Sequence, residues 1–141
     1  MPTFILVSHQ KFTPNWKEKW VYIGRDFSKI NYFEKQLDPK KRISIAQSFR
    51  NEFNSERDNF LFWIEKQRKK NKDSLFWWMS HLAGRNNMCS FIFESICQIK
   101  ALNITLNKNN FNNDRVLVIC ENIFLFNSVY SNLKGSYNIK K

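Results

Sequence analysis

The sequence contains few of the cysteines and histidines on which domains stabilised by disulfides or bound metal ions depend. Its 141 residues include only 3 cysteines, 2 histidines, 3 glycines and 3 prolines. Two histidines cannot supply a His-rich metal site, and neither an HExxH motif nor a CxxC pair occurs, so we expect no bound metal. The scarcity of glycine and proline predicts long regular elements joined by few tight turns.

The three cysteines, Cys89, Cys97 and Cys120, are odd in number. On a helix, Cys89 and Cys97 would lie about 12 Å apart, which is too far for a disulfide. We therefore expect three reduced core cysteines, as in an intracellular protein. Residues 4–7 are too short an apolar run for a signal peptide, and no run reaches the roughly 18 residues that span a bilayer. These absences predict a cytoplasmic protein with no transmembrane segment.

Motifs for cofactors and for nucleophilic catalysis are also missing. No GxGxxG sequence follows a strand-like segment, and neither GxxxxGK[ST] nor GxSxG occurs. The chain thus lacks the usual backbone cradles for dinucleotides and nucleoside triphosphates, and the nucleophile elbow of hydrolases. We expect no cofactor and no catalytic residue.

Positive charge, in contrast, is abundant, with a formal net charge of +11. Such a balance favours an anionic partner, namely nucleic acid, an anionic lipid surface or a phosphorylated substrate. The other interpretation is a composition bias in which Lys and Asn fill solvated positions, as in residues 103–113. Basic and aromatic residues are interspersed at 17–22, which suits single-stranded nucleic acid, but no RNP, KH, helix-turn-helix or zinc-finger signature occurs. A membrane surface is favoured less, because no predicted helix combines a lysine-rich face with a large apolar one.

Hydrophobic patterning predicts one α/β domain over residues 1–141. Residues 3–8 and 115–120 are continuous apolar runs, which are typical of strands buried on both faces of a parallel sheet. Residues 20–23 predict another short strand, and residues 136–139 lead toward a further one. Because only two or three strands are evident before the chain stops, we expect an incomplete Rossmann-like half, with a small parallel sheet and long helices.

Helical spacing accounts for most of the remaining chain. Asp38 suits an N-cap and Pro39 the first helical position, so a long helical region is predicted from there, with a break near Asn54 and a second cap at Ser55. Further helices are predicted from about 88 to 107 and from 123 to 133, the latter stopped by Gly135. Residues 31–37 are ambiguous, and the apolar residues 75–79 fit either a buried strand or the opening of a helix.

Polar residues follow two predicted strands, where open parallel sheets bind their ligands. Ser8 and His9 follow the first strand, but neighbouring residues of an extended chain point in opposite directions, so they are no catalytic pair. They form either a solvated loop or a ligand contact. Glu121 and Asn122 follow the strand at 115–120, where an acidic residue can bind a sugar hydroxyl or cap the next helix.

A second cluster combines two tryptophans with hydrogen-bonding side chains. Its members are Trp77, Trp78, Ser80, His81, Arg85 and Asn86. Stacking area beside such groups suits a sugar ring, a base or a phosphate. The alternative is that one tryptophan lies in the core, the other is half exposed, and Arg85 and Asn86 form a polar turn before the helix.

Residues 76–99 resemble the amino-terminal region of bacterial surface carbohydrate biosynthesis proteins, which are glycosyltransferase-like. The similarity extends over residues 75–133, under half of the chain. The matching residues are Trp77, Trp78, Ser80, Arg85, Asn86, Ser90, Phe93 and Cys97.

The resemblance implies two Rossmann-type halves. The first half would shape an acceptor or glycan pocket, and the half that binds a nucleotide sugar would lie beyond Lys141. This chain would then be inactive by itself. The alternative, a small basic protein that binds nucleic acid, depends on the charge alone.

Overall fold

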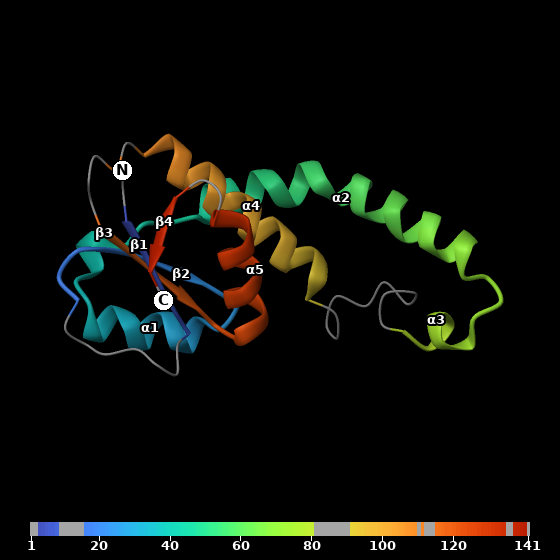
Figure 1. Ribbon diagram of the computed structural model, residues 1–141, viewed down its shortest axis with the longest axis horizontal. Helices are drawn as coiled ribbons and strands as arrows, with labels where there is room; N and C mark the ends of the chain where they lie inside the picture. The colour runs from blue at the N-terminus through green and yellow to red at the C-terminus, as the bar shows by residue number, and fades with distance from the viewer. Residues whose placement is uncertain are drawn as a thin grey trace.

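The computed structural model describes residues 3–8, 16–80, 91–109, 111, 115–134 and 137–140. It is an α/β structure with a small parallel sheet and long helices (Figure 1). In chain order the elements are β1 (Thr3–Ser8), β2 (Lys19–Ile23), α1 (Phe27–Gln36), the 3-10 helix η2 (Pro39–Lys41), α2 (Ala46–Lys70), α3 (Leu75–Met79), α4 (Ile92–Lys108), β3 (Arg115–Cys120), α5 (Ile123–Leu133) and β4 (Asn138–Lys140).

The sheet has the strand order β2-β3-β1-β4, and every neighbouring pair is parallel. In the centre, Phe4 pairs with Val116 and Ser8 with Cys120, which confirms that the two continuous apolar runs lie side by side. The short strand predicted at 20–23 is β2. Near the further strand suggested at 136–139, the structure has β4 at residues 138–140, beside β1, while residues 135 and 136 lie outside the described residues.

Each face of the sheet has its own core, because β2 and β3 alternate their buried side chains between two sets of helices. On one face, Trp20, Tyr22, Leu117 and Ile119 pack with residues of α1 and the segment after it, Phe33 and Leu37. On the other, Val21, Ile23, Val116, Val118 and Cys120 pack with Leu102 and Leu106 of α4 and with Leu125, Val129 and Leu133 of α5. Helices on both faces explain why these strands are continuous apolar runs in the sequence.

The cysteines that the structure describes, Cys97 and Cys120, are free and buried in this core. Burial raises the pKa of the Cys97 thiol to about 11 and that of Cys120 to about 12, so both are protonated at neutral pH. Cys89 lies outside the described residues.

The predicted break near Asn54 and Ser55 is wrong, since α2 runs without interruption over 25 residues. Ser55 does not cap a helix; its hydroxyl donates to the carbonyl oxygen of Glu52 at 3.3 Å, as serines inside helices do. Aromatic packing holds the two halves in line, because the rings of Phe53 and Phe60, on either side of the break, both contact Phe93 of α4, with centroids 4.9 and 4.8 Å away.

The start of this helix also differs from the prediction. Asp38 is an N-cap and Pro39 follows it, but they open η2, and α2 begins only at Ala46. The ambiguous residues 31–37 belong largely to α1, whose N-cap is Asp26. Residues 75–79 form the short helix α3, and the helix predicted from 88 is described from Ile92 onward, as α4.

Candidate functional site

The carboxyl ends of β2 and β3 bring two polar segments together. β2 ends at Ile23 and β3 at Cys120, and these residues are paired. The turn at residues 24–26 therefore lies beside Glu121 and Asn122, and the amide of Glu121 donates to the carbonyl oxygen of Ile23 at 2.9 Å. Ser8 pairs with Cys120 at the end of β1 on the same edge, while His9 lies outside the described residues.

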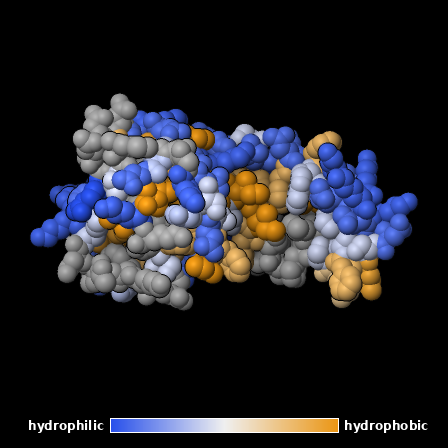
Figure 2. Space-filling view, viewed as in Figure 1, coloured by the Kyte–Doolittle hydropathy of each residue, from blue (hydrophilic) through white to orange (hydrophobic). Residues whose placement is uncertain are grey.

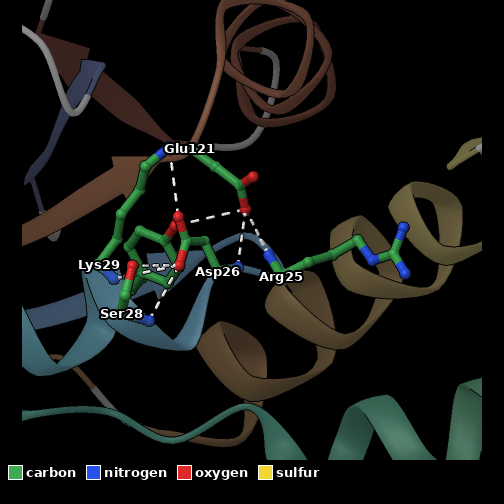
Figure 3. A network of polar contacts seen from close by, with 6 residues as sticks. Arg25, Asp26, Ser28, Lys29 and Glu121 are labelled. Carbon is green, nitrogen blue, oxygen red and sulfur yellow. Dashed lines mark hydrogen bonds and ion pairs between the residues drawn. The ribbon is translucent and has the colours of Figure 1, made fainter.

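Glu121 binds the turn that leads into α1. Its Oε2 atom accepts hydrogen bonds from the backbone amides of Arg25 and of Asp26, the latter at 3.2 Å, and from the Tyr22 hydroxyl at 3.3 Å (Figure 3). Burial, followed by the charge of Glu121, raises the pKa of the Tyr22 hydroxyl well above its usual range, so Tyr22 stays a hydrogen-bond donor. The Oε2 atom of Glu121 thus joins the end of β3 to β2 and to the turn before α1.

Gly24 makes this close approach possible. A Cβ atom at this position would lie 2.2 Å from Oε2 of Glu121, 2.6 Å from its Cβ and 2.7 Å from the Tyr22 hydroxyl oxygen. All three distances are shorter than van der Waals contact. Any larger residue at position 24 would therefore have to displace Glu121 or Tyr22.

Two side chains cap the helices that begin at this edge. Asp26 accepts from the amides of Ser28 and Lys29 at the start of α1 (Figure 3). Asn122 caps α5, where its Oδ1 atom accepts from the amide of Leu125 at 2.9 Å. Capping of α5 therefore falls to Asn122, while Glu121 serves the turn before α1.

We expect Asn122→Ala to lower the free energy of unfolding by about 1 kcal/mol, because one amide at the start of α5 loses its acceptor. Asn122→Ser should keep most of the stability, since a serine hydroxyl is an equally good cap. Urea unfolding of both variants measures this. Equal losses in the two variants would contradict a capping role.

A cavity of about 380 Å³ opens between this edge and α4. We call it the edge cavity, and its lining residues are Arg25, Asp26, Phe91, Glu94, Ser95, Gln98, Glu121, Asn122 and Leu125. Most of these side chains can donate or accept hydrogen bonds. They come from three separate parts of the chain, the turn after β2, the first turns of α4, and the junction between β3 and α5.

Arg25 and Glu94 form the charged wall of the edge cavity. The Arg25 side chain extends away from Glu121 toward α4 (Figure 3), where its Nε atom lies 2.8 Å from Oε2 of Glu94. Its guanidinium also lies over the ring of Phe91, 4.3 Å from the centroid. Burial raises the pKa of the Glu94 carboxyl, and nearby Glu121 raises it further, although Arg25 opposes both. Glu94 is therefore a partly desolvated acceptor, which strengthens any hydrogen bond that a ligand donates to it.

Gln98 ties α4 to the edge. Its amide nitrogen donates to the carbonyl oxygen of Gly24 at 3.2 Å, and the residue is 5% exposed. Glu94, Ser95 and Gln98 share one face of α4 because residues three and four apart are neighbours on a helix. The polar pair Glu94 and Gln98, spaced four residues apart in the more apolar first half of α4, is the signal by which the sequence could have revealed this wall.

Comparison of the chain with protein families, with curated proteins and with solved structures finds no match. Function is therefore inferred from the site itself. In the part of the chain that the structure describes, no group of three or more His, Cys, Asp or Glu is placed to hold a metal ion. The edge cavity offers a carboxylate, amides, a hydroxyl and a guanidinium, a set suited to binding hydroxyl groups.

The second predicted cluster lies elsewhere. Trp77 and Trp78 are in α3 and Ser80 is its C-cap, at the far end of α2 from the sheet (Figure 1). The indole NH of Trp78 donates to the carbonyl oxygen of Lys72 at 2.8 Å, while that of Trp77 is buried without a hydrogen-bond partner among the described atoms. His81, Arg85 and Asn86 lie outside the described residues. The structure thus does not bring the tryptophans together with Ser8, Glu121 and Asn122.

Proposed function

We propose that this chain is the acceptor-side, or glycan-side, domain of a glycosyltransferase-like protein of surface polysaccharide biosynthesis. It would bind a sugar in the edge cavity and would not catalyse transfer by itself. The observation that carries the proposal is the place and lining of this cavity. It lies at the carboxyl ends of parallel strands, where α/β sheets bind ligands, and polar side chains converge on it.

The lining suits a sugar better than a planar apolar ligand. Glu94 accepts from hydroxyl groups, Arg25 and the Asn122 amide donate, and Ser95 does either. The volume, about 380 Å³, lies in the range of small-molecule sites. Because Glu121 already accepts hydrogen bonds from the turn that leads into α1, we assign the ligand contact to Glu94 in preference to Glu121.

A Rossmann-like origin is supported by parallel strands with helices on both faces. The strand order departs from the usual pattern, because β2 lies at the edge beyond β3 instead of beside β1. We accordingly propose a Rossmann-like domain with an altered strand order.

The alternative partner is nucleic acid, which the net charge of +11 favours. In the described residues, exposed Lys and Arg side chains occur on α1, η2, α2, α4 and β4. Because α1 and α4 cover opposite faces of the sheet, the exposed basic side chains of the described residues lie on more than one face of the protein. This spread supports the sugar over the nucleic acid.

Titration of the ¹⁵N-labelled protein with monosaccharides, short oligosaccharides and nucleotide sugars, followed by NMR, tests the proposal. A sugar should shift the amides of residues 24–26, 94–98 and 121–125. Glu94→Gln should weaken binding roughly tenfold to 100-fold, because a hydrogen bond to a partly desolvated carboxylate is lost. The matched change Asp58→Asn, at an exposed position of α2, should leave the affinity unchanged.

Two outcomes would refute this function. One is that no sugar perturbs these amides. The other is that single-stranded DNA perturbs them with a steep salt dependence while sugars do not, which would indicate counterion release from a nucleic-acid site.

A further inference from the structure

The short helix α3 presents an apolar surface to solvent at the end of α2. Four of its five side chains are exposed: Leu75 is 71% exposed, Phe76 89%, Trp78 50% and Met79 73%. Single exposed hydrophobic residues are ordinary, but a contiguous group of large ones marks an interaction surface. We call these four residues the apolar tip.

Hydrogen bonds give the tip a defined shape. The turn after α2 is closed by the amide of Asn71, which donates to the carbonyl oxygen of Gln67 at 3.0 Å, and by that of Ser74, which donates to Asn71 at 3.0 Å. Ser74 then caps α3, and the Trp78 indole is bonded to Lys72. These contacts present the apolar side chains on an ordered protrusion, so little conformational entropy is lost when the tip docks.

A cationic collar adjoins the tip. It consists of four exposed lysines in the last turns of α2 and the following turn, Lys66, Lys69, Lys70 and Lys72. Lys66, Lys69 and Lys70 share a helix face because they are spaced three and four apart. Asp73 is the acidic residue of the same turn, so the collar is strongly positive even with it counted. Arg68 is left out of the collar because it pairs with Glu65 at 2.5 Å.

Figure 2 shows the two surfaces next to each other. Hydrophobic atoms occupy the lower side of the α3 end of the molecule, and hydrophilic atoms of the end of α2 lie above and beside them. Binding to a membrane surface calls for a lysine-rich surface beside an apolar one. No single helix among the described residues combines the two, but α2 supplies the lysines and α3 the apolar residues.

We propose that the apolar tip and the cationic collar form a docking surface for an anionic lipid membrane. Phe and Trp side chains favour the boundary between headgroups and acyl chains. Lysines near the surface are attracted to anionic headgroups, and their long side chains reach the headgroups while the tip inserts. A docking surface of this kind lies on the membrane, and none of the described helices combines the length and apolarity that crossing it would require.

The lysines of the cationic collar favour a membrane over a protein as the partner of the apolar tip. A hydrophobic protein interface generally excludes charge from its centre, whereas here four lysines adjoin four apolar side chains at one end of the protein. The net charge of +11 attracts the whole chain to an anionic surface, and the collar selects the end that docks. This inference does not depend on the proposed sugar site, which no residue of α2 or α3 lines.

Co-sedimentation with lipid vesicles tests the proposal. The intact chain should bind vesicles of phosphatidylcholine and phosphatidylglycerol in equal parts, and should bind vesicles of phosphatidylcholine alone far more weakly. The variant Lys69→Gln/Lys70→Gln/Lys72→Gln should lose on the order of 100-fold in affinity for the mixed vesicles, at roughly fivefold for each lysine. Leu75→Ser/Phe76→Ser should lose more than about tenfold, because less apolar surface enters the bilayer.

Matched controls keep the test specific. Phe27 and Phe124 are 79% and 80% exposed on other helices, so Phe27→Ser/Phe124→Ser should bind as the intact chain does. Lys35→Gln/Lys40→Gln/Lys108→Gln removes three exposed lysines elsewhere and should have a much smaller effect than the collar variant. All these side chains are exposed, and circular dichroism checks that each variant folds.

Three results would overturn the proposal. The first is the absence of binding to the mixed vesicles. The second is equal loss in the tip or collar variants and in their controls. The third is a dimer in light scattering that Leu75→Ser/Phe76→Ser abolishes, without vesicle binding, since the tip would then bind a second copy of the chain.

Discussion

Gly24→Ala should lower the free energy of unfolding by about 3 kcal/mol. Overpacking a filled site costs about 1–3 kcal/mol, and displacing the Glu121 carboxylate weakens its hydrogen bonds as well. Of the three atoms that the new methyl group would meet, the Cβ atom of Glu121, 2.6 Å away, is the least able to move, because it is fixed by the backbone after β3. Rotation of the Glu121 side chain alone therefore cannot relieve the clash.

Thermal and urea unfolding measure this effect, and a loss of this size corresponds to a fall in Tm of roughly 10 °C. Ser131→Ala, at an exposed position of α5, is the control for a small-to-alanine change away from the turn. A Gly24→Ala protein as stable as the unaltered one would show that the end of β3 and the turn after β2 separate freely. The close approach at Gly24 would then be no constraint on the fold.

Glu121→Ala should also cost about 3 kcal/mol, for a different reason. The change leaves two backbone amides and the Tyr22 hydroxyl without their shared acceptor. Tyr22 is 5% exposed, so its hydroxyl would remain desolvated, and an unmet buried donor costs about 1–3 kcal/mol. The amides of the turn can recover water more easily because the turn is closer to solvent.

A double-mutant cycle separates these contributions. Tyr22→Phe removes the donor, so the combined variant Tyr22→Phe/Glu121→Ala should be more stable than the sum of the single losses predicts. Glu121→Gln keeps an oxygen acceptor without the charge and should lose less than Glu121→Ala. Strict additivity in the cycle, measured by urea unfolding, would mean that the hydroxyl and carboxylate contribute independently.

The sheet could be predicted from the sequence where burial alone decides the structure. The runs at 3–8 and 115–120 are largely apolar, as expected of strands with helices on both faces of the sheet. The apolar run at 75–79 forms a helix instead, so the pattern of a short run does not by itself distinguish a strand from a helix. Local cap signals predict a helix break at Asn54. Packing of Phe53 and Phe60 on Phe93 overrides those signals, and a contact between residues far apart in the chain is invisible to local patterns.

The sequence predicts only part of the candidate site. Its place at the carboxyl edge, with Glu121 and Asn122, follows from the position of these residues directly after a predicted strand and from the rule for open sheets. The sequence does not predict that Arg25, Glu94 and Gln98 belong to the site, because their position depends on how α4 approaches the turn after β2. The bond from Gln98 to Gly24 joins residues 74 apart in the sequence, and only the folded chain brings them together.

The unbroken course of α2 has a mechanical consequence. Over 25 residues it extends roughly 37 Å, and the rings of Phe53 and Phe60 bind it to Phe93, the residue immediately before Glu94. Because α2 is one continuous helix, a tilt of its C-terminal end, next to α3, also tilts the portion that packs on Phe93. The anchorage of one end therefore sets the orientation of the other, and the opening beside Glu94 would face a fixed direction relative to whatever surface α3 rests upon.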